Sequence, residues 1–151
     1  MDLIDKSNYY FDYVNEPREI TLLNKQIKKD GDKLNKGSIP VNLDYNNYVI
    51  CLKSRSNNNI CSFIHFSIRT NFPNLDKFID KIIYINYSYT FINYRKLGLN
   101  KMLRLVLESA CKLNNCKAIV SVPFPESESR IVMQKLGYSN IFSDIFIKYI
   151  N

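Results

Sequence analysis

The residues best suited to do chemistry form one basic turn, Arg95-Lys96-Leu97-Gly98-Leu99-Asn100-Lys101. An expected strand ends just before this turn, and an expected amphipathic helix leaves it. Backbone N–H groups at a helix N-terminus have no intrahelical acceptor and lie at the positive end of the helix dipole. The chain has only 4 glycines in 151 residues, so Gly98 marks a tight backbone requirement. The turn therefore predicts an anion site suited to phosphate.

A second group of polar residues follows the strand expected over 82–90. Its odd positions carry large apolar or aromatic side chains, and its even positions carry hydrogen-bonding groups: Tyr84, Asn86, Ser88 and Thr90. Successive side chains of a strand point to opposite faces of the sheet. We therefore expect one face to pack and the other to line a polar cleft that ends at the Arg95 turn.

Titratable and metal-binding side chains are sparse elsewhere. His65 is the single histidine, and imidazole is the side chain whose unperturbed pKa lies near neutrality. The cysteines show no C-x-x-C spacing, which argues against a zinc site: Cys51, Cys61, Cys111 and Cys116. We expect free, mostly buried thiols and no metal.

Length and charge limit the class of protein. A chain of 151 residues is expected to form a single domain over 1–151. The formal net charge of +7 favours anionic partners such as a phosphorylated cofactor, nucleic acid or an acidic substrate. A coding bias toward Lys and Asn leaves a generic solubility role open. The N-terminus lacks a signal-peptide pattern and no apolar run reaches membrane-spanning length, so we expect a cytoplasmic protein that does not enter membranes.

The spacing of apolar residues predicts the elements that position these groups. A period of two predicts strands over 48–53, 60–70 and 82–90, and strands are also expected over 9–14 and 141–150. The nearly all-apolar run over 117–122 predicts a strand in the middle of a sheet covered on both faces. A helical period predicts a helix from Pro17 that Asp30-Gly31-Asp32 ends, a long helix after the turn, and a third helix capped by Ser127 or Ser129 that stops at Gly137. Residues 35–47 and 72–80 are expected connectors. The order predicts an α/β fold, a mixed sheet of about 6–7 strands flanked by helices.

Two segments resemble the GNAT superfamily of acyl-CoA-dependent N-acetyltransferases. The sequence Arg95-Lys96-Leu97-Gly98-Leu99-Asn100 is similar to the family pattern Arg/Gln-x-x-Gly-x-Gly/Ala between the fourth strand and the next helix, and Tyr94 supplies the aromatic residue before it. The sequence Lys135-Leu136-Gly137-Tyr138 is similar to the family's helix-then-Gly-Phe ending. The resemblance covers residues 82–140, whereas the first part of the chain matches only in the order of its elements.

The resemblance implies a cofactor and the residues that bind it. The backbone N–H groups of Lys96 to Lys101 would hold the pyrophosphate of CoA, and Arg95 opens this turn. The backbone of Ser88, Tyr89 and Thr90 would pair with the pantetheine arm where the fourth and fifth strands splay apart. The implied acyl-donor co-substrate is acetyl-CoA.

This chain also departs from the family pattern. Asn100 stands where the family has Gly or Ala, Met133 where many members have a Tyr acid, Ser121 where a Glu base is common, and Glu126 where an Asn is common. Other members place a base at the positions of Tyr84 and Asn86. The catalytic candidates are therefore Tyr84, Asn86, His65 and Ser121, each with a structural role as the alternative.

The sequence leaves three functions open. We expect direct acetyl transfer from acetyl-CoA to a primary amine on a small molecule or a protein, by a monomer or homodimer. The alternative is a catalytically silent module of the same fold that binds acyl-CoA or a protein partner. The hypothesis of nucleic-acid binding is supported by net charge alone, so we consider it the weakest of the three hypotheses.

Overall fold

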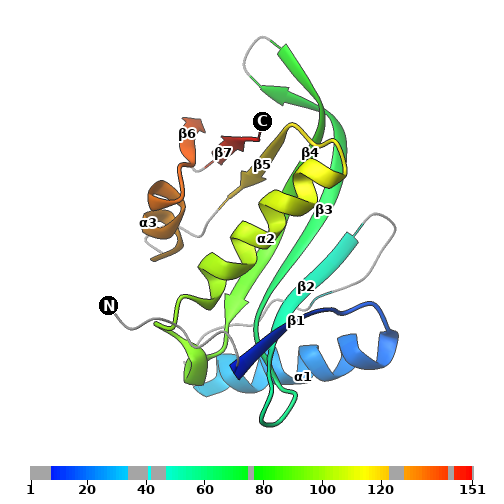
Figure 1. The fold of residues 1–151 in the computed structure, drawn as a ribbon, viewed down its shortest axis with the longest axis vertical. Coiled ribbons are helices and arrows are strands. Elements are labelled where there is room, and N and C mark those ends of the chain that lie inside the picture. Colours follow the sequence, from blue (N-terminus) through cyan, green and yellow to red (C-terminus); the bar gives the residue numbers. More distant parts are fainter. Residues whose placement is uncertain are drawn as a thin grey trace. The chain divides into compact units, whose positions relative to one another are not determined.

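The computed structural model describes residues 8–33, 41, 47–74, 77–122, 128–142 and 145–150. In this part of the chain, seven strands form one mixed sheet in the order β1-β2-β3-β4-β5-β7-β6 (Figure 1). The elements are β1 (Tyr9–Tyr13), α1 (Pro17–Lys33), β2 (Asn47–Ser54), β3 (Ile60–Asn74), β4 (Lys77–Thr90), the 3-10 helix η2 (Ile92–Tyr94), α2 (Leu99–Leu113), β5 (Ala118–Ser121), α3 (Glu128–Lys135), β6 (Ser139–Phe142) and β7 (Ile145–Tyr149). The predicted fold class, a mixed sheet with helices, is confirmed.

The chain divides into two compact units. The first contains the residues up to His65 together with Ser88–Leu103. In it β1 pairs antiparallel with β2, from Tyr9 opposite Ser54 to Tyr13 opposite Ile50. Helix α1 buries Ile20, Leu23 and Ile27, the apolar residues that give this segment its helical period.

The second unit contains Phe66–Tyr87 and the residues from Arg104 onward. Here β5 pairs parallel with β4 and antiparallel with β7. All four residues of β5 are buried, as predicted for a strand in the middle of a sheet. Its side chains on one face join a core cluster with those of neighbouring strands: Ile79, Ile82, Ala118, Val120 and Ile147.

The predicted end of the first helix is wrong. Helix α1 continues through Asp30 and Gly31 to Lys33, and both Asp30 and Gly31 are buried. Asp30 favours turns when its carboxylate bonds to nearby backbone. In this fold the carboxylate instead accepts hydrogen bonds from distant residues, Tyr89 and Ile92, so it does not compete with the helix.

Three further predictions of elements need correction. The connector expected over 72–80 is largely strand, because β3 extends to Asn74 and β4 begins at Lys77. The final strand expected over 141–150 is two strands, β6 and β7, which pair antiparallel with a register irregularity between Asn140 and Phe142. Helix α3 starts at Glu128, so Ser129 is not its cap. Ser127 and Glu126 lie outside the described residues, as does most of the connector over 35–47.

The ends of the two later helices follow one pattern. Tyr138 N–H donates to the Met133 carbonyl and Gly137 N–H to the Gln134 carbonyl, with Gly137 at φ +90°. These are the two bonds of a Schellman cap. Helix α2 ends in the same way with Asn115 at φ +58° in the glycine position. The predicted role of Gly137 as a C-terminal cap is confirmed.

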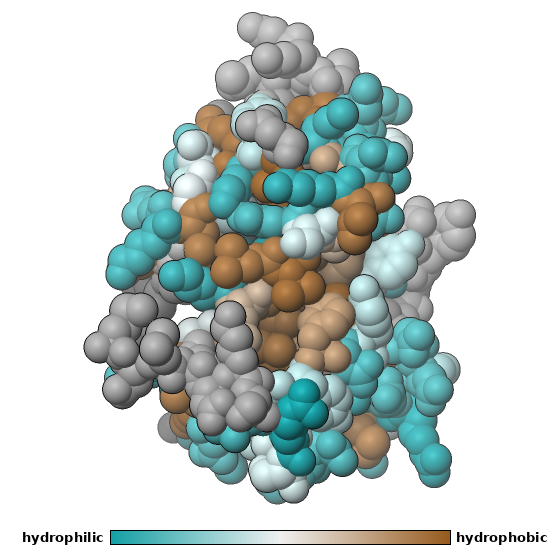
Figure 2. Space-filling view, viewed as in Figure 1, coloured by the Kyte–Doolittle hydropathy of each residue, from teal (hydrophilic) through white to brown (hydrophobic). Residues whose placement is uncertain are grey.

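The visible surface is mixed in character. Figure 2 shows hydrophilic residues over much of the face in view, with hydrophobic side chains exposed between them. In the part of the chain that the structure describes, no helix has both the length and the apolar character to span a membrane.

Candidate functional site

The basic turn has the backbone geometry of an anion site. Lys96 and Gly98 both adopt left-handed φ values, +64° and +76°, and the Met102 N–H donates to the Gly98 carbonyl as α2 begins. The N–H groups of Leu99 to Lys101 therefore lie at the positive end of the helix. Leu99 is 1% exposed and anchors the helix, while residues 95–98 are exposed. The turn is fixed at one side and open to a ligand at the other.

Arg95 connects this turn to the end of β4 through two contacts. Its Nε donates to the Thr90 carbonyl at 2.9 Å, and its guanidinium carbon lies 5.2 Å from the centre of the Tyr89 ring. The Thr90 carbonyl, an expected partner of the pantetheine arm, thus already accepts one hydrogen bond. A carbonyl oxygen has a second lone pair, so Arg95 limits this acceptor without blocking it.

Asp30 connects α1 to the residues just before the turn. The Tyr89 hydroxyl donates to its carboxylate, and the Ile92 N–H lies 3.3 and 3.4 Å from the two carboxylate oxygens. The Asp30 residue is only 7% exposed. The sequence did not predict this role for Asp30, because an Asp before a Gly is typical of a helix end.

The predicted pantetheine segment lies where β4 extends past β5. The β4–β5 pairing runs from Ile82 opposite Ala118 to Ile85 opposite Ser121. Strand β5 ends there, whereas β4 continues to Thr90. Thr90 is connected to β3 by a side-chain hydrogen bond, because the Ser62 hydroxyl oxygen lies 2.8 Å from Thr90 Oγ1. Residues Ser88–Thr90 thus extend beyond the described β5 pairing, and their role toward pantetheine stays a prediction.

Tyr84 and Asn86 belong to one network with β3. The Arg69 guanidinium carbon lies 3.8 Å from the centre of the Tyr84 ring. Arg69 Nε donates to Ser67 Oγ at 3.3 Å, and Ser67 Oγ lies 3.5 Å from Asn86 Oδ1. Tyr84 is half-buried and Asn86 is exposed. These two candidates are brought together, with Arg69 as an additional member that the sequence analysis did not single out.

Ser121 does not join Tyr84 and Asn86. It pairs with Ile85, and paired residues of adjacent strands direct their side chains to the same face. The neighbours of Ile85, which are Tyr84 and Asn86, point to the opposite face. Ser121 is also 4% exposed. A shared catalytic role for Ser121 with those two residues is therefore geometrically disfavoured.

The last candidates from the sequence are His65 and the cysteine thiols. His65 is half-buried on β3, and its catalytic role stays a prediction. All four cysteines are free and buried, as predicted. Burial raises the pKa of the Cys51 and Cys111 thiols to about 12, so both stay protonated near neutrality and are poor nucleophiles.

Comparison with solved structures gives matches over nearly the whole chain. An Arabidopsis thaliana NAA60 structure in complex with acetyl-CoA matches with a TM-score of 0.70 and 14% identity over 95% of this chain and 99% of that one. A GNAT-family acetyltransferase from Staphylococcus aureus matches with a TM-score of 0.71 and 12% identity over 95% and 99%. The ribosomal-protein-S18-alanine N-acetyltransferase from Escherichia coli matches with a TM-score of 0.68 and 12% identity over 95% and 94%.

The chain has the GNAT acetyltransferase fold. Searches by sequence find no matching family model and no matching curated protein. At this low identity the structural matches establish the fold alone. The fold resemblance predicted from the two motifs is confirmed.

Within the GNAT fold, the residue at the usual acid position belongs to the core. Met133 is fully buried, and its carbonyl accepts the capping hydrogen bond from Tyr138. Tyr138 is not a substitute acid, because burial raises the pKa of its hydroxyl to about 12 and its residue is 4% exposed. The Arg104 guanidinium carbon lies 5.8 Å from its ring centre. The residues at this end of α3 therefore contribute to the packing of the core.

Asn100 occupies the second position of α2 and is half-buried. Its backbone N–H lies in the first turn, where an anion would approach. The neighbouring Lys96 and Lys101 are exposed and add positive charge, and the first turn of α2 contains no acidic residue. The departure at Asn100 thus adds a side chain to a site whose backbone and charge still suit phosphate.

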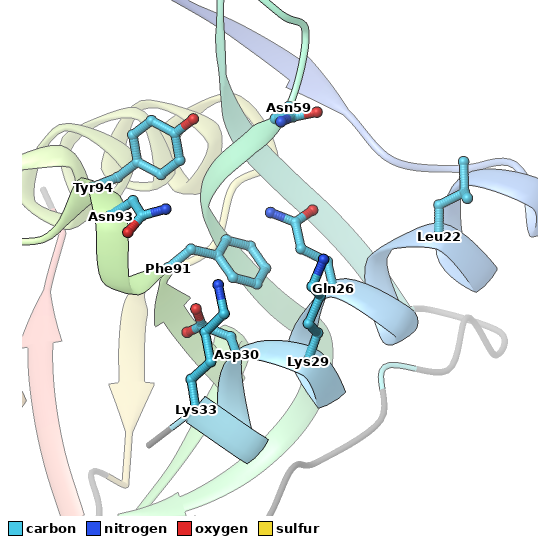
Figure 3. A pocket seen from close by; sticks show the side chains of 9 residues that line it. All are labelled: Leu22, Gln26, Lys29, Asp30, Lys33, Asn59, Phe91, Asn93 and Tyr94. Carbon is cyan, nitrogen blue, oxygen red and sulfur yellow. The ribbon is translucent and has the colours of Figure 1, made fainter.

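A cavity of about 460 Å³ opens beside the residues that precede the turn. In Figure 3, Gln26, Lys29 and Lys33 extend toward it from α1, and Phe91 and Tyr94 face it from the other side. The remaining lining residues are Leu22, Asp30, Asn59 and Asn93. The cavity has amide, aromatic and lysine side chains around the buried Asp30 carboxylate. Within the described residues, no three His, Cys, Asp or Glu side chains converge as a metal site would require.

Proposed function

We propose that this chain transfers an acetyl group from acetyl-CoA to a primary amine. The observation that carries the proposal is the exposed basic turn at the N-terminus of α2, with Lys96 and Gly98 in left-handed conformations. Backbone N–H groups at such an end suit a pyrophosphate without any particular side chain. The GNAT fold of the chain supports the same cofactor, since one matching structure is in complex with acetyl-CoA.

The chain's own residues would act mainly by positioning. When bound, acetyl-CoA supplies a thioester, an activated acyl donor. Transfer forms a C–N bond to the amine, breaks the C–S bond and moves one amine proton to the thiolate. Holding amine and thioester together can supply much of the rate even when the base is weak. The Tyr84 hydroxyl and Asn86 amide are the groups we assign to order water near the amine.

The assay is release of free CoA thiol with a panel of primary amines. Direct transfer in a ternary complex predicts intersecting initial-velocity patterns, whereas an acetyl-enzyme intermediate predicts parallel lines. The absence of a suitable nucleophile among the buried, high-pKa thiols Cys51 and Cys111 favours direct transfer. Parallel lines, or release that needs no amine, would contradict the proposed reaction.

A catalytically silent GNAT-fold module is the second candidate. The buried Met133 favours it, because that position holds an apolar core residue and offers no acid to the leaving thiolate. The two candidates differ in one measurement. Binding of acetyl-CoA without CoA release for any amine in the panel would support the silent module, and amine-dependent release would exclude it.

A further inference from the structure

Arg69 is an exposed cation that the fold holds in a fixed orientation. Its guanidinium lies over the Tyr84 ring at 3.8 Å, and its Nε donates to Ser67 Oγ at 3.3 Å. Ser67 is buried and lies 3.5 Å from the Asn86 amide oxygen. Stacking on an aromatic ring and a fixed Nε restrict the rotamers of a long side chain that would otherwise be mobile.

This arrangement uses one edge of the guanidinium and leaves the other for a ligand. Arginine carries five N–H donors in a planar fork. Among the described residues, the hydrogen bond from Arg69 to Ser67 engages Nε alone, and Arg69 is exposed, so Nη1 and Nη2 are the groups that a ligand can reach. That edge matches the two oxygens of a carboxylate.

The location of this cation matters for the proposed reaction. Arg69 shares a face with Tyr84 and Asn86, as their contacts show. The described pairing of β4 with β5 ends at Ile85, directly beside both residues. A group bound by the Arg69 fork would therefore lie beside the end of the described β4–β5 pairing.

We propose that Arg69 binds a carboxylate of the acceptor, so that the acceptors are amines that also carry a carboxylate group, such as amino acids or peptides with a free carboxyl terminus. This inference rests on the proposed function, because only an acyltransferase has an acceptor. Carboxylate binding at Arg69 can nevertheless be measured without turnover. Tyr84 and Ser67 act as positioning residues that hold the fork. Asn86 lies beside it and can contact the same ligand.

The experiment compares carboxylates with their amides by NMR titration of the whole chain. The probes are the N-acetyl derivatives of glycine, leucine and glutamate and the corresponding amides, followed at the Arg69 side-chain N–H signals. We expect at least one acid to bind about tenfold more tightly than its amide, the size of a charge-assisted bidentate contact. Equal affinity for every acid and amide, or no binding of any probe, would overturn the proposal.

A matched control separates recognition from general charge. Arg55 is another exposed arginine stacked on a tyrosine, 5.5 Å from the Tyr10 ring centre. Arg69→Met should abolish the preference for acids, and Arg55→Met should leave it unchanged. A preference that survives Arg69→Met, or is lost equally in both variants, contradicts the inference. If Arg69→Met does not fold, Arg69→Lys decides, since it keeps the charge, loses the fork and should reduce the preference severalfold.

Titration with acetyl-CoA distinguishes this inference from the proposed function. Loss of acid preference in Arg69→Met with unchanged acetyl-CoA binding assigns the effect to the acceptor site. Failure of the natural chain to bind acetyl-CoA would refute the proposed function, while the probe titration would still decide whether Arg69 binds carboxylates.

Discussion

Replacing Asp30 by alanine should weaken the junction between α1 and the end of β4. The carboxylate accepts from the Tyr89 hydroxyl and the Ile92 N–H, and the residue is 7% exposed. Ile92 opens η2, the short helix that leads into the Arg95 turn. The substitution removes both acceptors at once and leaves two donors near a largely buried position.

The expected cost follows from these two contacts. A hydrogen bond to a charged group contributes about 1.5–3 kcal/mol to stability. The Ile92 N–H lies 3.3 and 3.4 Å from the carboxylate oxygens, which is long and favours the lower limit. We therefore expect Asp30→Ala to lower the free energy of unfolding by about 3 kcal/mol, and Tyr89→Phe by about 1.5 kcal/mol.

Urea unfolding measures these values. For a small protein the free energy changes by about 1–3 kcal/mol per molar urea, so Asp30→Ala should lower the midpoint by roughly 1 M or more. The double variant should cost less than the sum of the single variants, because both lose the same bond. A cost under about 0.5 kcal/mol for Asp30→Ala, or full additivity, would refute this account of the junction.

The remaining predictions concern conformation and titration. Gly137→Ala should lower the free energy of unfolding by about 1–2 kcal/mol through its left-handed φ, since the added Cβ meets Lys148 at an ordinary 3.6 Å; an unchanged urea midpoint would contradict this. The Cys111 thiol, with its pKa raised to about 12 by burial, should react with a thiol reagent at pH 8 only on unfolding, and immediate reaction in the native protein would be the contrary result. A hydrogen bond from Lys53 lowers the pKa of Asp12 below 3.8, so its stabilisation is present above that pH and is lost as the pH falls through the folded-state pKa. Asp12→Asn should therefore destabilise at neutral pH and flatten the acid side of the stability profile, which acid titration of the unfolding midpoint measures.

Local sequence patterns predicted the parts of the fold that local physics determines. The alternating residues of β4, the apolar stripe of α1 and the cap at Gly137 depend on neighbours along the chain. The strand, the buried stripe and the cap are confirmed, whereas the polar cleft expected along one face of β4 stays a prediction. The turn between β4 and α2 also follows from its own residues, because a glycine and a helix start are enough to specify it.

The parts that the sequence did not predict depend on contacts between distant residues. Asp30 stays helical because of Tyr89 and Ile92, which are 59 and 62 residues away. Arg69 becomes notable only once Tyr84 lies beneath it. The separation of Ser121 from Tyr84 depends on the β4–β5 register, and a shift of one residue would reverse it.

Calorimetric titration with acetyl-CoA tests the central claim most directly. The account predicts saturable one-to-one binding that Gly98→Ala weakens strongly, because Gly98 lies in the turn at φ +76°. Gly137→Ala is the matched control, since it introduces the same change at φ +90° outside the turn and should leave the affinity unchanged. Absence of binding by the folded protein at millimolar acetyl-CoA, or equal weakening by both variants, would contradict the assignment of the Arg95 turn as a cofactor site.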